Sequence, residues 1–331
     1  MKAFEWTNPT SVAEAVNMLT GSSPDIDEAP RPLAGGQDLL TTMKDYTSRP
    51  VRVVNLKNIR GLDKINISGH GLTIGALVTL SELEEHAGVR KSFPGLSEAA
   101  HSIATPQIRN LGTVGGNLCQ RPRCWYFRLE EVNCLKKGGS ECYAAHGENK
   151  YNAIIAGGPS YIVHPSDLAP MLLALGASVT VVGAKGKRSI PLDKFFTLPS
   201  EGNIRRENVL KNEEIITEIN VPSSPVAARS TYLKFKERDS LDFALASAAV
   251  AVQLEDRTVR DARIVLGGVA PIPWRVPAAE KFVIGKSLTP DVLAEAAKIA
   301  LADARPLEKN AYKVPLAQTL VRRALAKAGQ S

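Results

Sequence analysis

Three short segments rich in glycine and other small residues set the strongest limit on how this chain can fold. They are residues 33–39 (LAGGQDL), 73–76 (TIGA) and 105–117 (TPQIRNLGTVGGN). Paired glycines let backbone N–H groups come close to a phosphate, and they adopt positive φ angles at no steric cost. A long dinucleotide contacts several loops at once. Three separate glycine segments therefore suit a dinucleotide ligand better than a single glycine loop would. The alternative for any single segment is that its glycines simply form turns.

Two better-known phosphate-binding motifs are absent from the sequence. It contains neither G-x-G-x-x-G nor G-x-x-x-x-G-K-[ST], and residues 183–189 (GAKGKRS) lack the spacing of the second motif. The glycine segments therefore do not predict a Rossmann or P-loop site.

Hydrophobic periodicity and turn residues predict an α+β protein. Capping boxes at Ser11 and Ser81 each predict the start of a helix. The other predicted helices span residues 95–104, 167–175, 289–304 and 313–328, and the predicted strands span residues 51–56, 72–76, 177–182, 231–236, 244–253 and 260–266. The sequence Pro-Ser-Ser-Pro at 222–225 is the best candidate for a domain boundary. We expect residues 1–225 to form two subdomains and residues 226–331 to form a C-terminal α+β domain.

All four cysteines lie within 24 residues, in a polar segment of weak periodicity that spans residues 119–152, here called the cysteine insert. They are Cys119, Cys124, Cys134 and Cys142. Four thiolates suit a [4Fe–4S] cluster, and a tetrahedral zinc site is the chemical competitor. Two disulfides are a third interpretation, which is disfavoured because the sequence shows no secretion signal. Unligated cysteines are the fourth.

Taken in order, the three glycine segments resemble the flavin-binding segments of the xanthine dehydrogenase/carbon monoxide dehydrogenase flavoprotein family. The resemblance covers nearly the whole chain and includes residues 164–170 (HPSDLAP) and 232–236 (YLKFK). It implies a vanillyl-alcohol-oxidase-like (PCMH-type) FAD-binding domain of two subdomains, followed by a separate α+β domain. It also implies that FAD binds through Leu33, Ala34, Gly35, Gly36, Gln37, Asp38, Leu39, Ile74, Gly75, Thr105, Gly112, Thr113, Gly115, Gly116, Asn117, Asp167 and Lys234, with Lys236 an equal candidate for the last position.

The cysteine insert resembles a segment found in a subset of these flavoproteins. Residues 117–128 (NLCQRPRCWYFR), followed by Cys134 and Cys142, are similar to the insert in the flavin subunits of the periplasmic aldehyde oxidoreductase and of 4-hydroxybenzoyl-CoA reductase. That subset holds an additional [4Fe–4S] cluster, so the resemblance implies that Cys119, Cys124, Cys134 and Cys142 are its ligands.

The resemblance implies the flavin subunit of a molybdenum hydroxylase that oxidises an aldehyde or heteroaromatic substrate. Its partners would be a large subunit with the molybdenum cofactor and a small subunit with [2Fe–2S] clusters, and FAD would pass electrons to an external acceptor. Since the flavin carries the chemistry, no catalytic side chain is expected. The alternatives are a stand-alone MurB-like flavoprotein reductase, the flavin subunit of a hydroxybenzoyl-CoA-type reductase, and a non-enzymatic iron–sulfur or zinc module.

Charge and hydropathy limit the partners and the cellular location that can be expected of this chain. The formal net charge is +7, but the basic residues are scattered and lack interleaved aromatics, so nucleic acid is not an expected partner. No apolar run is long enough to span a membrane, and no signal peptide is visible. We therefore expect a cytoplasmic protein, with a periplasmic location only by co-export with a partner subunit. The five histidines show no metal-ligand spacing.

Overall fold

The computed structural model describes residues 1–21 and 25–330. The N-terminal subdomain holds a parallel sheet in the order β1 (Glu5–Thr7), β3 (Arg52–Asn55), β2 (Arg31–Leu33). Helix α1 (Val12–Leu19) begins after Ser11, whose side chain accepts a hydrogen bond from the backbone N–H of Glu14. The apolar face of α1 packs on β3, and the short helix α2 (Leu39–Lys44) follows the first glycine segment.

The second subdomain is built on an antiparallel sheet in the order β4-β5-β8-β6-β7. Its strands are β4 (Ile65–Ser68), β5 (Gly71–Gly75), β6 (Ser178–Gly183), β7 (Gly186–Pro191) and β8 (Ile215–Pro222). Helices α3 (Leu80–Glu85), α4 (Ala87–Ser92), α5 (Pro94–His101) and α9 (Leu168–Ala174) supply much of its core. Because the central strand β8 pairs with both β5 and β6, segments far apart in sequence share one sheet.

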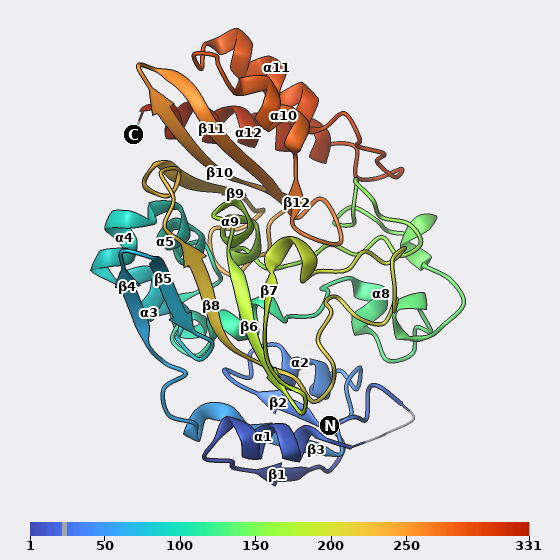
Figure 1. Cartoon of the computed structure of the whole chain (residues 1–331). Coiled ribbons are helices and arrows are strands. Elements are labelled where there is room, and N and C mark those ends of the chain that lie inside the picture. The colour runs from blue at the N-terminus through green and yellow to red at the C-terminus, as the bar shows by residue number, and fades with distance from the viewer. Residues whose placement is uncertain (22–24, 331) are drawn as a thin grey trace.

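The C-terminal region contains an antiparallel sheet in the order β12-β11-β10-β9. Its elements are β9 (Ser230–Phe235), β10 (Ala246–Glu255), β11 (Thr258–Gly267), β12 (Trp274–Arg275), α10 (Pro277–Val283), α11 (Pro290–Ala300) and α12 (Lys313–Gln330). Side chains alternate between the two faces of a strand. In β10, Ala248 and Val250 therefore join the core under α10–α12, whereas Ala249 and Ala251 join the core of the second subdomain. Figure 1 shows this sheet stacked above the five-stranded one.

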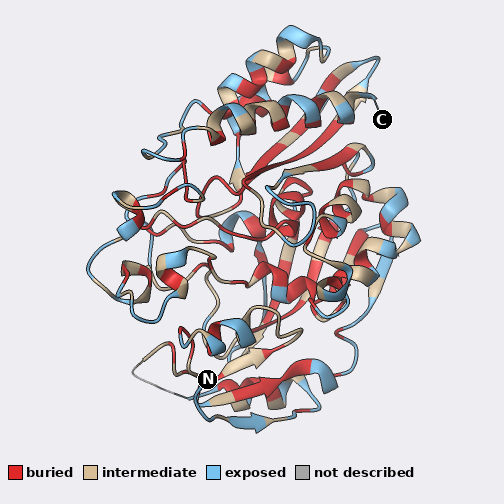
Figure 2. Cartoon of the chain, turned by 180° about the vertical axis from the view of Figure 1, so that it is seen from behind, coloured by how far each residue is buried: buried red, intermediate tan, exposed pale blue. Residues whose placement is uncertain are grey.

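The cysteine insert lies to one side of these sheets and has little regular structure (Figure 1). It follows the short helices α6 (Pro106–Arg109) and α7 (Val114–Leu118), and its own helix α8 (Trp125–Arg128) spans a single turn. Two 3₁₀ turns, Leu135–Lys137 and Tyr143–Ala145, complete it. Buried residues concentrate along the sheets and the helices that cover them, whereas much of the insert is exposed or half-buried (Figure 2).

The α+β class and the two N-terminal subdomains are confirmed, and one predicted helix start is wrong. Helix α3 begins after Thr79, not Ser81: the Thr79 side chain accepts from the backbone N–H of Glu82, and the Glu82 carboxylate accepts from that of Thr79 at 2.7 Å. Ser81 instead donates to the side chain of Asn110 at 2.6 Å. Strands β7 and β8 and helix α10 were not predicted. Within the described residues, no helix combines the length and apolar character needed to cross a membrane.

Candidate functional site

The three glycine segments meet at one cavity of about 540 Å³, here called the glycine-lined cavity. The first and third segments are in direct contact, because a Cβ added to Gly35 would lie 2.0 Å from the carbonyl oxygen of Leu111. The second and third segments are joined by a hydrogen bond from the backbone N–H of Gly115 to the carbonyl of Ala76, at 2.9 Å. Glycine is therefore required at these contacts for the chain to close around the cavity.

Most of the predicted cofactor-binding residues line this cavity. Those that do are Ala34, Gly35, Gly36, Gln37, Asp38, Leu39, Gly112, Thr113, Gly115, Gly116, Asn117 and Asp167. Five others are not in its wall: Leu33, Ile74, Gly75, Thr105 and Lys234. Leu33 and Ile74 are buried in hydrophobic clusters, and Gly75 packs against the backbone of Leu62. The Thr105 side chain caps helix α6.

The backbone around the cavity offers donors to an anionic ligand. Gly36 has a φ of +75°, a conformation that favours glycine. No described residue accepts a hydrogen bond from the backbone N–H of Gly36 or of Gln37. Gly116 is exposed although its neighbours in α7 are mostly buried, and a Cβ there would approach only the Thr113 side chain. These features fit a phosphate held by main-chain N–H groups.

Asp38 lines the cavity, and its carboxylate is also bound by the cysteine insert. The backbone N–H of Arg121 donates to its carboxylate at 2.7 Å, and the guanidinium groups of Arg128 and Arg123 lie 2.7 and 3.1 Å from it. All three arginines belong to the cysteine insert. Asp38 therefore anchors the insert to the first glycine segment, and its hydrogen-bonding capacity is largely used within the protein.

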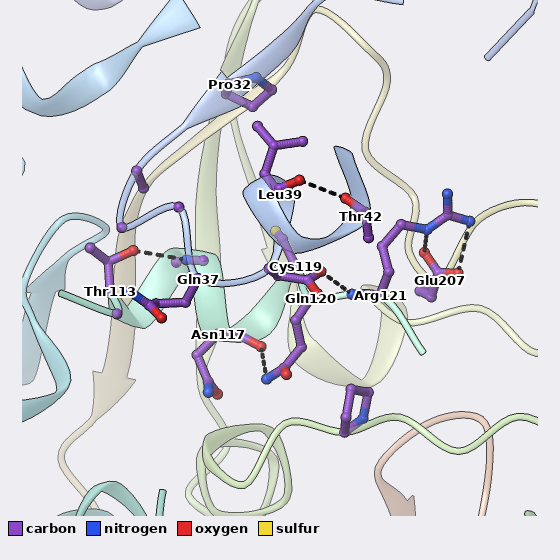
Figure 3. Close-up of a pocket in the computed structure, with 18 of the residues that line it drawn as sticks. Pro32, Gln37, Leu39, Thr42, Thr113, Asn117, Cys119, Gln120, Arg121 and Glu207 are labelled. Carbon is purple, nitrogen blue, oxygen red and sulfur yellow. Dashed lines mark hydrogen bonds and ion pairs between the residues drawn. The ribbon is translucent and has the colours of Figure 1, made fainter. Parts of the chain in front are cut away.

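A group of arginines on the cavity wall was not predicted from the sequence. Arg31, Arg121, Arg205 and Arg206 line the cavity beside Glu207. Arg121 contacts the Glu207 carboxylate at 3.2 Å (Figure 3). Burial, together with the positive charges of Arg121 and Arg206, lowers the pKa of Arg31 to about 10. An anionic ligand would relieve this repulsion. Apart from the adjacent pair Arg205 and Arg206, these arginines are separated in sequence and follow no motif, so no sequence signal identifies them.

Asp167 lies at the end of the cavity nearest the C-terminal sheet, where two side chains hold it. Tyr232 donates to one carboxylate oxygen at 2.6 Å, and the Lys234 ammonium lies 2.7 Å from the other. Burial, followed by the Asp167 charge, raises the pKa of Tyr232, so its phenol stays protonated and donates. Lys234 therefore acts on the cavity through Asp167. Lys236, its alternative, contacts the loop carbonyls of Asp239 and Ser240 instead.

The four cysteines do not form one site in the structure. Cys119 ends helix α7 and lines the glycine-lined cavity, where Figure 3 shows its sulfur among the cavity side chains. Burial, with a smaller effect of the Glu207 charge, raises the pKa of its thiol to about 12. Cys124, Cys134 and Cys142 lie farther along the insert. Across the described residues, no group of three or more His, Cys, Asp or Glu side chains is arranged to hold a metal ion.

Sequence comparisons connect this arrangement to known proteins. Residues 2–224 match the family of the FAD-binding domain in molybdopterin dehydrogenase, and residues 230–328 match the CO dehydrogenase flavoprotein C-terminal domain. The chain is 34% identical to an aldehyde oxidoreductase FAD-binding subunit of Escherichia coli, over 99% of both chains. It is 31% identical to the carbon monoxide dehydrogenase medium chain of Hydrogenophaga pseudoflava, over 97% of this chain and 96% of that one.

Solved structures agree with these matches. A CO dehydrogenase chain from Oligotropha carboxidovorans superposes with a TM-score of 0.78 at 26% identity, covering 99% of this chain and 98% of that chain. The carbon monoxide dehydrogenase of Hydrogenophaga pseudoflava gives a TM-score of 0.76 at 30% identity, covering 99% and 97%. Sequence and fold agree over the whole length, and this chain belongs to the family of FAD-binding subunits of molybdopterin-dependent dehydrogenases.

Proposed function

We propose that this chain binds FAD in the glycine-lined cavity and serves as the flavin subunit of a molybdenum hydroxylase. The observation that carries the proposal is the convergence of three glycine segments and a set of arginines on one cavity. Bound FAD would accept two electrons and pass them on, a chemistry that the cofactor itself supplies. Residues 1–225 would form the flavin-binding unit, and residues 226–331 would close the cavity through the loop that contains Phe243.

The binding residues fall into three groups in this proposal. Backbone N–H groups of Gly36 and Gln37 would hold the diphosphate beside the exposed Gly116, supported by the positive charges of Arg31 and Arg206. Asp167, held by Tyr232 and Lys234, would face the flavin end of the cofactor. The carboxylate of Asp167 is positioned from both oxygens, which keeps one negative charge at a constant place in a buried environment.

The partners and reaction are proposed from the relatives. The matched proteins include medium chains and FAD subunits of aldehyde oxidoreductase, carbon monoxide dehydrogenase and nicotinate dehydrogenase. We infer a large molybdenum-cofactor subunit and a small [2Fe–2S] subunit, with an aldehyde or a heteroaromatic compound as substrate. This assignment is favoured over a stand-alone flavoprotein, because the described carboxylates of the cavity wall are all ion-paired within the protein. They are Asp38, Asp167, Glu207, Glu214 and Asp242.

Gly116→Val tests the flavin site. Its Cβ meets only the Thr113 hydroxyl, so the protein should fold, yet the branched side chain would occupy the place of a phosphate. We expect wild-type protein to show flavin absorption that chromatography identifies as FAD, and the variant to lose at least nine-tenths of it. Gly69→Val, where nothing lies within 4 Å of an added Cβ, is the matched control. A folded Gly116→Val protein with full FAD would refute the site.

The subunit assignment has its own test. The full chain expressed alone should bind FAD but oxidise aldehydes or purines at a negligible rate. Affinity purification from its native host should recover two further subunits. Substantial aldehyde turnover by the isolated chain would instead favour the stand-alone enzyme.

We further propose that the cysteine insert belongs to the iron–sulfur subset and holds a [4Fe–4S] cluster through Cys124, Cys134 and Cys142. Burial raises the pKa of the Cys124 and Cys134 thiols, and the Cys142 charge makes a smaller contribution to each. Because the described side chains form no group of three arranged around a metal ion, the proposal is supported by the resemblance of the insert and by the clustering of its cysteines in the sequence. Cys119 faces the glycine-lined cavity instead. Since a cluster of this type has four irons, three thiols leave one iron without a cysteine ligand. We assign no electron-transfer step to the cluster.

A further inference from the structure

A second cavity, of about 460 Å³, lies between the cysteine insert and the C-terminal region. We call it the aromatic cavity, because Trp125 and Tyr126 of α8, Tyr151 and Phe243 line it. Its volume lies in the range typical of small-molecule sites. None of the described residues of the three glycine segments lines it, so the proposed diphosphate site does not fill it. Asp167, at the proposed flavin end, lines both cavities, and Cys124, a proposed cluster ligand, lines the aromatic cavity alone.

The aromatic cavity adjoins the glycine-lined cavity. Five residues line both: Arg123, Pro165, Asp167, Asp242 and Phe243. The Arg123 guanidinium lies 4.8 Å from the centre of the Phe243 ring while also contacting Asp38 at 3.1 Å. The wall between the cavities is therefore one layer of side chains. A molecule bound in the aromatic cavity would face the Asp167 end of the other, where the proposed function places the flavin ring.

The walls of the aromatic cavity are suited to an uncharged planar ring. The Trp125 and Tyr151 rings lie edge to face, with centroids 5.6 Å apart, and Trp125 is 53% exposed at the mouth. Aromatic side chains bind flat rings through stacked or edge contacts. The cavity thus offers an open approach from solvent to a ring-shaped site.

The charges at the mouth are already paired. Lys150 contacts the Glu237 carboxylate, which also accepts a hydrogen bond from the Tyr151 hydroxyl at 2.8 Å. Arg238 lies 3.7 Å from Asp242. Among the described lining residues, Gly268 is the only glycine, so no phosphate-binding loop is present. This chemistry does not fit a nicotinamide dinucleotide, which carries two phosphates.

We propose that the aromatic cavity binds the external electron acceptor and that this acceptor is a quinone. The proposal rests on the flavin function proposed above. In the step that it implies, the reduced, two-proton form of FAD gives two electrons and two protons to the quinone. Both carbonyl oxygens of the quinone become hydroxyls, and FAD returns to its oxidised form. No further reactant is needed.

The binding test uses the full chain with its FAD and duroquinone, whose ring has no free position at which a thiol could add. Val163→Phe places a larger side chain in the aromatic cavity without touching the glycine-lined one. We expect equilibrium dialysis to show at least a tenfold weaker binding of duroquinone, with the FAD content unchanged. The matched control is Val51→Phe, an exposed position in the wall of neither cavity.

A kinetic test follows the chemically reduced flavin as it is reoxidised. Val163→Phe should slow reoxidation by duroquinone about tenfold and leave reoxidation by dioxygen unchanged, since dioxygen is small enough to bypass the blocked cavity. Trp125→Ala, at an exposed position that folding tolerates, should slow the quinone reaction about fivefold and serves if Val163→Phe does not fold.

These experiments distinguish failure of the quinone site from failure of the proposed flavin function. If wild-type protein holds no FAD, the proposed function fails. If both variants hold FAD and bind and reduce duroquinone like wild type, only the quinone site is overturned. If NAD⁺ rather than duroquinone reoxidises the flavin, and Val163→Phe abolishes that reaction, the cavity is an acceptor site but the acceptor class is wrong.

Discussion

The glycine-lined cavity and the cysteine insert place their characteristic residues in opposite ways. Gly35 and Leu111 are far apart in the sequence, yet they are in contact. The cysteines are close in sequence, yet Cys119 lines the glycine-lined cavity and Cys124 lines the aromatic cavity. The glycine segments are attached to sheets and helices whose packing brings them together. The insert has no such framework, so its position is determined by ion pairs such as that between Arg128 and Asp38.

The comparison teaches that proximity in sequence is a weak guide to a shared site where regular structure is absent. Cys119 directly follows helix α7 and is packed against the main hydrophobic core. Lys136 of the insert is buried and contacts Glu207 at 3.1 Å. Different contacts therefore hold the start and the middle of the insert, and the spacing of the cysteines in the sequence does not determine whether their thiols meet.

Gly35→Val should have the largest effect, because it strikes the contact on which the cavity depends. The new Cβ would lie 2.0 Å from the Leu111 carbonyl oxygen, and backbone cannot move aside as a flexible side chain can. We expect loss of FAD and a fall in unfolding free energy at or above the upper end of about 1–3 kcal/mol. Chemical denaturation with flavin analysis measures both. A variant as stable as wild type would show that the two segments do not touch.

Comparing the iron content of Cys134→Ser with that of Cys119→Ser tests whether the two cysteines differ in metal binding. If the insert holds a cluster through its three later thiols, anaerobically purified wild-type protein should contain about four irons. Cys134→Ser should then lose most of them, whereas Cys119→Ser should keep them. Iron and sulfide analysis gives the result. Equal loss in both variants would mean that all four thiols converge, as the sequence predicted, and an iron-free wild-type protein would remove the cluster.

Lys313→Met tests how the insert is held to the C-terminal region. The Lys313 ammonium donates to the carbonyls of Tyr151, Asn152 and Gly268, and burial lowers its pKa to about 7. The unfolded value is about 10.4, so between pH 7 and 10 the unfolded state binds more protons. Unfolding free energy should therefore rise with pH in this window, by up to about 1.4 kcal/mol per pH unit.

In the Lys313→Met variant this rise should be reduced, because the titrating group is gone. The cost of burying the charge is greatest below pH 7 and has disappeared above the unfolded pKa. Denaturation at several pH values compares the slopes, with the exposed Lys281→Met as control. An unchanged slope would show that Lys313 does not titrate in this range.

Thr79→Ala should have the smallest effect. The Thr79 side chain caps α3 beside the second glycine segment, and loss of such a cap costs about 1 kcal/mol. Ser81→Ala, which removes the cap predicted from the sequence, should cost less, because the Ser81 side chain bonds only that of Asn110 and does not cap the helix. Thermal unfolding ranks the two variants. If Ser81→Ala lowers the unfolding temperature more than Thr79→Ala does, Ser81 is the helix cap, as the sequence predicted.

Several features of the fold were determined by local sequence. The predicted strand at 177–182 corresponds to β6 and the predicted helix at 313–328 to α12, because periodicity and capping act over one or two turns. The α1 cap at Ser11 is also as predicted. The error at Thr79 arose because Thr79 and Ser81 each have a glutamate three residues later, so the two positions compete on sequence alone.

Only the tertiary structure decided how these parts share one site. The glycine segments and Asp167 were recognisable in the sequence, and the structure brings most of these residues to one cavity. The arginines on the wall, the capture of Asp38 by the insert and the separation of Cys119 had no recognisable sequence signal. These features depend on packing and on ion pairs between residues that are distant in the chain. Such contacts form only after folding has buried both partners and removed water from them, so the local sequence does not reveal them.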